Sequence, residues 1–165
     1  MVLETITTIG IMSPVCISIY DGINISSFYL SNFENSDKML IAAIESIMKP
    51  CYKDNVVYLH NFSYFDAVFL IKILSSFNAK ISPIIRDNCI IDFKFKFKYS
   101  NNKFITLYFR DSYLLIPSSL SSSAYLSRVF KVLKKDIFPY KNLNLKKINY
   151  TGNVPLFEEF DNISL

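Results

Sequence analysis

The stretch YLHNFSYFDAVFLIKIL, residues 58–74, contains the features that decide the fold. Val56–Leu59, which overlaps its start, is a short apolar run that predicts a buried strand. Apolar residues then recur at helical spacing, which predicts a helix over residues 65–77 with one side facing a core. The loop His60–Tyr64 joins the two, so polar side chains stand between the end of a strand and the start of a helix.

Toward the N-terminus the pattern predicts an antiparallel meander. Val2–Thr8 and Pro14–Tyr20 are rich in β-branched residues, and Asp21-Gly22 is a hairpin turn leading into residues 23–30. Ser36 is then the expected cap of a helix that ends at Lys49-Pro50. We expect this helix to cover one face of a sheet.

Toward the C-terminus, residues 92–99 alternate strictly between charged and aromatic residues, and the charged ones after Asp92 are lysines. With Lys103–Phe109 after the turn Asn101-Asn102, this alternation predicts a half-buried hairpin. We interpret Lys94, Lys96 and Lys98 as its solvated face, which also guards a sheet edge, and assign them no site. Strands with interspersed helices in this order predict a single α/β domain with a mixed sheet.

Bulk composition narrows the classes of partner. The net charge of +4 permits a polyanionic partner, and three cysteines without a CxxC pair indicate a reduced compartment. The longest charge-free runs, Thr5–Tyr20 and Ser112–Ser127, are shorter than the roughly 18–20 apolar residues of a spanning helix. The N-terminus has no secretion signal, and Glu4 argues against a transit peptide, so we expect no membrane partner.

Asp66 is the first candidate for chemistry, because it stands in the first turn of the expected helix near His60 and Asn61. Oxygen ligands of this kind suit Mg²⁺ or Mn²⁺, and two such ions about 4 Å apart promote phosphodiester hydrolysis. The alternative is structural, since a carboxylate at a helix N-terminus is stabilised by the helix dipole. Spacing alone leaves both interpretations open.

Three blocks carry a family resemblance. The stretch of residues 58–74 resembles the second exonuclease motif of organellar and viral type B DNA polymerases. Residues 110–120, RDSYLLIPSSL, resemble the next block of that family, and Lys135–Tyr140 followed by Tyr150–Pro155 resembles the one after it. Their order and spacing agree over nearly all 165 residues.

The resemblance implies a ribonuclease-H-like mixed sheet with flanking helices, truncated at its C-terminus. Residues 1–165 are then the front part of the 3′→5′ exonuclease domain of a protein-primed polymerase, without palm, fingers or thumb. The first strand of the family carries an Asp-x-Glu pair, for which this chain has Val2-Leu3-Glu4. Glu4 and Asp66 match two family carboxylates, Val2 replaces the bridging Asp, and the last carboxylate would lie beyond Leu165.

The resemblance also implies residue roles. Glu4 and Asp66 would bind Mg²⁺ or Mn²⁺, weakly here, and Lys135 would approach the scissile phosphate. The residues expected to line the channel for a single-stranded DNA 3′ end are Thr5, Tyr58, His60, Asn61, Phe65, Phe69 and Ser112. Structural alternatives are core packing for Phe65, Phe69 and His60. Asp111 is either an extra carboxylate or the acceptor of a turn or strand-end hydrogen bond.

We therefore expect the intact protein to replicate organellar or plasmid DNA, in a mitochondrion, with metal-dependent proofreading and a terminal protein as primer. Two close divalent ions need several negative ligands, so a chain with Val2 in place of Asp is expected to be a very poor exonuclease. Two alternatives remain, a catalytically dead module that binds single-stranded DNA or another protein, and a remnant that does not fold stably.

Overall fold

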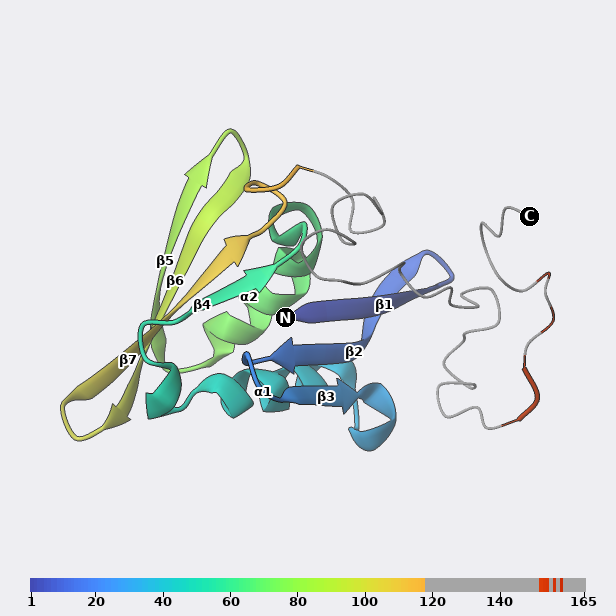
Figure 1. Ribbon diagram of the computed structural model, residues 1–165, viewed down its shortest axis with the longest axis horizontal. Helices are drawn as coiled ribbons and strands as arrows, with labels where there is room; N and C mark the ends of the chain where they lie inside the picture. Colours follow the sequence, from blue (N-terminus) through green and yellow to red (C-terminus); the bar gives the residue numbers. More distant parts are fainter. Residues whose placement is uncertain (118–151, 155, 157, 159–165) are drawn as a thin grey trace. The chain divides into compact units, whose positions relative to one another are not determined.

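A computed structural model describes residues 1–117, 152–154, 156 and 158 (Figure 1). The chain divides into two compact units, of which the first comprises Met1–Glu4 and Pro14–Pro117 and the second comprises Thr5–Ser13 and Ser118–Leu165. The main elements are β1 (Val2–Thr8), β2 (Ile11–Tyr20), β3 (Ile25–Tyr29), α1 (Ser36–Ile47), β4 (Val56–Leu59), the π-helix η3 (Phe62–Asp66), α2 (Ala67–Ser76), β5 (Ala79–Arg86), β6 (Cys89–Ser100) and β7 (Lys103–Asp111).

The first sheet has the strand order β1-β2-β3, and its hairpin turn confirms the predicted one. β2 and β3 pair antiparallel, and the loop between them is closed by Asp21, whose carboxylate accepts hydrogen bonds from the backbone N–H groups of Ile23 and Asn24. Gly22 takes a φ of 100°, a conformation that costs glycine little. The turn therefore needs both residues of the Asp-Gly pair.

The second sheet has the strand order β4-β7-β6-β5, so β7 and β6 are interior strands. β4 pairs parallel with β7, whereas the β7–β6 and β6–β5 pairs are antiparallel. The backbone nitrogen of Met1 donates to the carbonyl oxygen of Tyr58 at 2.9 Å, so β1 begins beside β4. The expected mixed α/β architecture is confirmed. The interior position of β6 contradicts our interpretation of its lysines as guards of a sheet edge.

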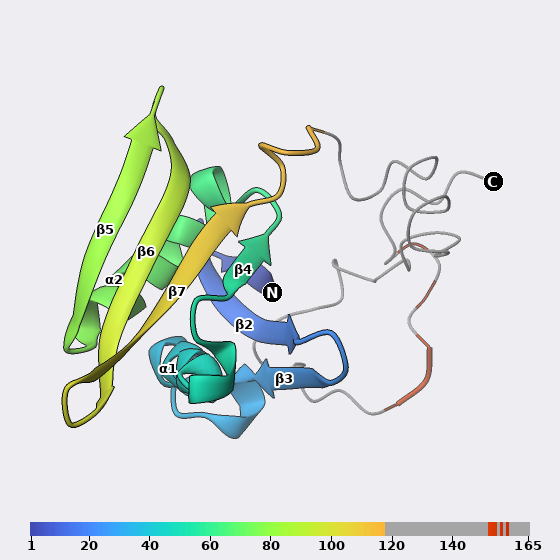
Figure 2. The ribbon, with the colours of Figure 1, turned by 60° about the vertical axis from the view of Figure 1, so that its left-hand side comes forward.

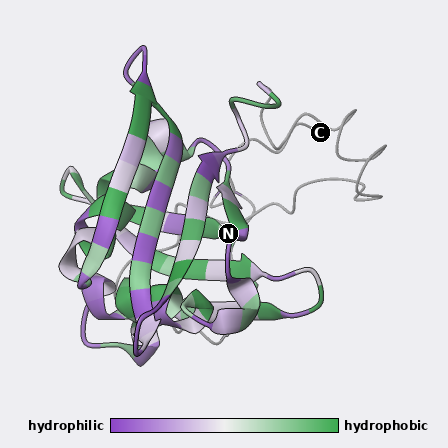
Figure 3. Ribbon diagram, turned by 90° about the vertical axis from the view of Figure 1, so that its left-hand side faces the viewer, coloured by the Kyte–Doolittle hydropathy of each residue, from purple (hydrophilic) through white to green (hydrophobic). Residues whose placement is uncertain are grey.

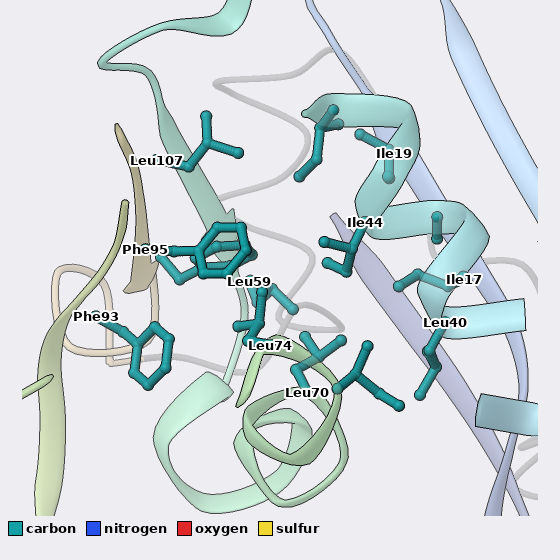
Figure 4. Close-up of a cluster of buried hydrophobic side chains, with 14 of the residues drawn as sticks. Ile17, Ile19, Leu40, Ile44, Leu59, Leu70, Leu74, Phe93, Phe95 and Leu107 are labelled. Atoms are coloured by element: carbon teal, nitrogen blue, oxygen red, sulfur yellow. The ribbon is translucent and has the colours of Figure 1, made fainter. Parts of the chain in front are cut away.

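The core lies between the helices and one face of the strands (Figure 4). Figures 1 and 2 show α1 and α2 on the same side of the second sheet. Phe109 contacts two other phenylalanines edge to face, with ring centroids 6.2 Å from Phe93 and 6.5 Å from Phe95. Full burial of an apolar side chain of this size stabilises the fold by about 1.5–3 kcal/mol. Labelled members of this core are Ile17, Ile19, Leu40, Ile44, Leu59, Leu70, Leu74, Phe93, Phe95 and Leu107.

The predicted cap of α1 is wrong by one residue. Asn35, not Ser36, is the N-cap, because its side chain accepts a hydrogen bond from the backbone N–H of Lys38 at 2.9 Å. Ser36 instead donates its hydroxyl to the carbonyl oxygen of Pro14, 2.7 Å away. Asparagine and serine cap helices equally well, so the sequence alone does not choose between neighbours.

The sequence pattern also does not predict β5. Pro83 lies in this strand, and proline removes a backbone donor from a ladder. The structure accommodates it because β5 is the last strand of its sheet. Across the described residues, no helix is long and apolar enough to cross a membrane.

Candidate functional site

The loop after β4 begins with a strained backbone. Asn61 has a φ of 64°, in the left-handed region, which asparagine tolerates better than most residues. The next residues form the π-helix η3, where the sequence predicted a loop up to Tyr64 and a regular helix from Phe65. Single π-helical turns are often found at functional sites. The loop and η3 thus separate the end of β4 from the start of α2.

Asp111 fixes this loop. Its Oδ1 accepts hydrogen bonds from the backbone nitrogens of Asn61 and Tyr113, and its Oδ2 accepts one from that of Ser63, each at 2.9 Å. The Asp111 side chain is buried, so these contacts satisfy a carboxylate that has left water. The structure confirms the strand-end hydrogen-bonding role that the sequence favours for Asp111.

His60 and Ser112 meet because β4 and β7 run parallel and end together, with Leu59 opposite Asp111. The Nδ1 atom of His60 lies 3.3 Å from the Oγ atom of Ser112. The backbone nitrogen of Ser112 donates to the carbonyl oxygen of Leu59 at 2.8 Å, and the ring of Tyr113 stands edge-on to His60 at 5.5 Å. His60 is half-buried, so one side of this pair faces solvent.

Asp66 has an unusual carboxyl group. It is buried, and no side-chain hydrogen bond from it caps α2. Burial raises the pKa of Asp66 to about 7, and repulsion from Asp111 and Glu4 adds to the rise. Glu4, exposed on β1, therefore lies close enough to Asp66 for their charges to interact.

The candidate site has few groups that could hold a divalent ion. Within the described part of the chain, no group of three His, Cys, Asp or Glu side chains is arranged to hold a metal. Asp111 uses both carboxylate oxygens for backbone N–H groups, and Val2 contributes no oxygen. Glu4 and Asp66 supply the hard oxygen ligands that Mg²⁺ and Mn²⁺ prefer. The described residues therefore offer two hard ligands, where two close divalent ions would need several.

The structure places the predicted DNA contacts in different surroundings. Phe65 and Phe69 are half-buried with ring centroids 6.2 Å apart, and Phe69 also packs against the core. The exposed side chain of Tyr58 stands on the strand position paired with Arg110. Thr5 follows Glu4 on β1 but belongs to the second unit, and Lys135 lies outside the described residues.

The sequence did not reveal one charged pair near this site. The Nε atom of Arg110 donates to the Oδ1 atom of Asp92 at 2.7 Å, and the Asp92 carboxylate raises the pKa of the guanidinium. The guanidinium also lies 5.8 Å from the ring centroid of Tyr108. The two residues are 18 positions apart and belong to different strands, so no short-range sequence pattern predicts that they pair. The sequence shows only that each of two half-buried strands carries a charge of opposite sign.

Comparison with known proteins gives a family match. The profile of the family "DNA polymerase type B, organellar and viral" matches residues 46–163. A "Probable DNA polymerase" of Neurospora intermedia is 40% identical over 92% of this chain, and one of Ascobolus immersus is 33% identical over 90%. The chain covers 16% and 12% of the lengths of these two relatives.

A solved structure is also similar. Phi29 DNA polymerase complexed with primer-template DNA matches 82% of this chain with a TM-score of 0.55 and 19% identity, over 24% of its own chain. At this identity the likeness concerns the fold alone. It confirms the expected fold class, a mixed α/β fold of the ribonuclease-H-like kind.

Proposed function

Because this chain belongs to the type B DNA polymerases of organelles and viruses, we propose that residues 1–165 form part of a 3′→5′ proofreading exonuclease domain. The observation that carries the proposal is the pairing of His60 with Ser112 at the ends of β4 and β7, next to the loop that leads to the buried carboxylate of Asp66. A protein that copies DNA and removes mispaired nucleotides needs a site that takes a single-stranded 3′ end. The geometry around β4 and β7 supports such a site.

In this proposal, His60 and Ser112 contact the last sugar or phosphate of the strand. Their side chains are paired at 3.3 Å and come from two strand ends that pair in register, so their positions are fixed. Small polar groups of this kind hold a sugar–phosphate backbone without reading sequence. Phe65 and Phe69 offer aromatic rings beside the same loop, and rings stack on any base. Asn61, Tyr58 and Thr5 remain candidates for further contacts.

Glu4 and Asp66 would hold Mg²⁺ or Mn²⁺. In phosphodiester hydrolysis such an ion polarises the phosphoryl oxygen and lowers the pKa of a bound water. The chain's own contribution is to keep Asp66 beside a second carboxylate in a buried position, where it gains a proton near neutral pH. Binding of a cation and binding of a proton at Asp66 therefore compete.

This chain alone is proposed to be a very poor exonuclease. Val2 replaces one expected carboxylate, and residues that act as a catalytic unit fail together. Lys135 is proposed to offset charge at the scissile phosphate in the intact enzyme. A purified chain that shortens a single-stranded 3′ end with Mg²⁺, and stops when Asp66 becomes Ala, would show that this part of the proposal is wrong.

The intact protein is proposed to replicate mitochondrial or linear-plasmid DNA from a terminal protein. The family match and the DNA bound in the phi29 polymerase structure support DNA as its partner. The polymerising palm, fingers and thumb are proposed to lie outside residues 1–165, which agrees with the small share of the relatives that the chain covers.

End-specific binding tests the proposed site. A single-stranded oligonucleotide and its circularised form, equal in length and sequence, are compared by fluorescence anisotropy without metal. We expect the linear form to bind several-fold more tightly, and the His60→Ala/Ser112→Ala variant to lose that preference. Equal binding of both forms by the unsubstituted chain would remove the 3′-end site.

A second candidate is a module that binds single-stranded DNA without cutting it. The lack of a three-ligand cluster in the described residues favours it. It predicts the same anisotropy results with no metal-dependent shortening by any variant. Restoration of a carboxylate at position 2 separates the two candidates, because only the exonuclease proposal expects a tighter metal site.

A further inference from the structure

The second sheet has a face that the proposed exonuclease site does not use. Phe93, Phe95 and Phe97 turn one side of β6 into the core, so the alternate residues face the other way. We call this the outer sheet face, and Figure 3 shows the alternation of hydrophilic and hydrophobic residues along its strands. Its residues are Tyr58, Lys80, Ser82, Ile84, Asp92, Lys94, Lys96, Lys98, Phe104, Thr106, Tyr108 and Arg110.

The outer sheet face is strongly basic. It carries four lysines and Arg110 against a single carboxylate, that of Asp92. Asp92 is already paired with Arg110 at 2.7 Å. None of Lys80, Lys94, Lys96 and Lys98 forms an ion pair with a described residue. The face therefore presents four uncompensated positive charges.

Two of the lysines stand opposite each other across strands. Lys80 on β5 is the register partner of Lys96 on β6. Like charges directly opposite one another destabilise a sheet, so the arrangement favours an anion that lies between them. Because a strand rises about 3.3 Å per residue, alternate lysines on β6 repeat about every 7 Å. The result is a regular row of cations.

An edge-guarding role does not explain the row. Lysines protect sheets when they stand on an edge strand, where unpaired backbone groups are exposed. β6 is paired on both sides, by β7 and β5, so Lys94, Lys96 and Lys98 have no edge to protect. Their position in the middle of the sheet calls for another reason.

Aromatic rings lie among these cations. The Nζ atom of Lys94 lies 5.5 Å from the ring centroid of Tyr108, and that of Lys96 lies 5.0 Å from that of Phe104. The side chains of Phe104 and Tyr58 are 50% and 43% exposed, which leaves part of each ring open for stacking. Cations interleaved with accessible rings are the usual composition of a surface that tracks single-stranded nucleic acid.

The face also leads to the proposed site. Tyr58 and Arg110 are register partners, and each stands two residues before a member of the His60–Ser112 pair. His60 and Ser112 directly follow the ends of β4 and β7, so the outer sheet face ends where the site begins. We propose that the outer sheet face binds single-stranded DNA, with phosphates on its four lysines and bases on Phe104 and Tyr58. That the bound DNA is the strand whose 3′ end enters the site rests on the proposed function.

The test uses circular single-stranded DNA, which has no 3′ end and so reports on the face alone. Binding to the full chain is measured by anisotropy from about 50 to 200 mM salt. The face variant is Lys80→Gln/Lys94→Gln/Lys96→Gln/Lys98→Gln. The control variant, Lys38→Gln/Lys49→Gln/Lys53→Gln/Lys72→Gln, removes the same number of charges from α1, the segment after it and α2. Far-ultraviolet circular dichroism melts report whether each variant is folded.

For the unsubstituted chain we expect log Kd to vary with log salt with a slope near 3, since each phosphate contact on a single strand contributes about 0.7. The face variant should lose most of that slope and at least tenfold in affinity at low salt, while the control variant changes by less than threefold. A Lys→Arg version of the face variant keeps the charge and should bind like the unsubstituted chain. Phe104→Leu should weaken binding several-fold with the slope unchanged.

Three results would overturn the proposal. These are unchanged binding by a folded face variant, equal weakening in the face and control variants, and tighter binding of duplex DNA than of the circle. Should the face variant fold poorly, Phe104→Leu decides instead, because unchanged binding by this folded variant would also overturn the proposal. The proposed 3′-end site is judged separately, because only the preference for linear DNA depends on His60 and Ser112.

Discussion

The carboxylate of Asp111, at the end of β7, holds Asn61 in a left-handed conformation. Its Oδ1 atom accepts a 2.9 Å hydrogen bond from the backbone nitrogen of Asn61, a residue with a φ of 64°. Asn61 is the first residue after the His60 position and leads directly into η3. One buried side chain on β7 therefore sets the direction in which the chain enters the candidate site. The geometry around Asp66 depends on a contact 50 residues away in sequence.

Removal of this carboxylate should be costly. We predict that Asp111→Ala lowers the free energy of unfolding by about 3–5 kcal/mol, because three backbone N–H groups lose a charged acceptor. Asp111→Asn keeps one acceptor oxygen, so its free energy of unfolding should fall by about half as much. Urea unfolding at pH 7.5 measures both.

Glu45→Ala is the matched control, since the Glu45 side chain is exposed on α1 and forms no ion pair with a described residue. It should change the stability by less than about 0.5 kcal/mol. If Asp111→Ala cost no more than this control, the loop would not depend on the carboxylate.

The raised pKa of Asp66 makes stability depend on pH. Its carboxyl has a pKa of about 7 when folded, against an ordinary value of 3.8, so between these values the folded state holds more protons than the unfolded state. Stability should therefore fall as pH rises from about 4 to 7 and then level off. One pKa unit corresponds to about 1.4 kcal/mol, which sets an upper limit of about 4 kcal/mol for the fall.

Asp66→Asn removes this titration while keeping the shape of the side chain. We predict that it melts higher than the unsubstituted chain at pH 8 and at nearly the same temperature at pH 4. Thermal unfolding at pH 4, 6 and 8 gives the comparison. Parallel curves for the two proteins over this range would contradict a raised pKa at Asp66.

Local sequence patterns predicted the parts of the fold that depend on neighbouring residues. β1 and β4 have the predicted limits, and the Asp21-Gly22 turn and the β6–β7 hairpin are where alternation and turn chemistry put them. The sequence does not predict β5, because Pro83 argues against a strand there. The strand tolerates this proline because it lies at the edge of its sheet, and edge position is a property of the whole sheet. The role of the β6 lysines was misread for the same reason, since alternation does not say which strands are interior.

Local sequence patterns also predict only part of the candidate site. Local order along residues 58–74 predicted that polar groups follow β4, and the structure has them there. The π-helical turn and the pairing of His60 with Ser112 depend on β7, which lies about 50 residues later in the chain. A short-range pattern contains neither, because both require the parallel register of two strands.

The cap of α1 offers a direct test of the corrected assignment. We predict that Asn35→Ala lowers stability by about 1 kcal/mol, because the backbone N–H of Lys38 loses its acceptor. Asn35→Asp keeps an acceptor at the same place and should restore nearly all of it. Thermal melts of the two variants and the unsubstituted chain at pH 7.5 test this prediction. If Asn35→Ala melted at the same temperature as the unsubstituted chain, Asn35 would not be the cap.

The replacement of the bridging Asp by Val2 gives the sharpest prediction about the proposed metal site. Val2 and Glu4 stand two residues apart on β1, so their side chains point to the same side of the strand. The charge of Glu4 also raises the pKa of Asp66. A third carboxylate would complete a set of hard ligands. Val2→Asp should therefore bind Mn²⁺ at least tenfold more tightly than the unsubstituted chain, as measured by water-proton relaxation at pH 8.

Val2→Asn has the same size as Val2→Asp without its charge, and Val2→Asp/Glu4→Gln returns the number of carboxylates to the original. Both should bind Mn²⁺ no better than the unsubstituted chain. The affinity of Val2→Asp should also fall below pH 7, because the ion must then displace a proton from Asp66, whose pKa is about 7. Equal Mn²⁺ affinity of Val2→Asp and Val2→Asn would mean that Glu4 and Asp66 do not share an ion, since two carboxylates already in place would respond to a third.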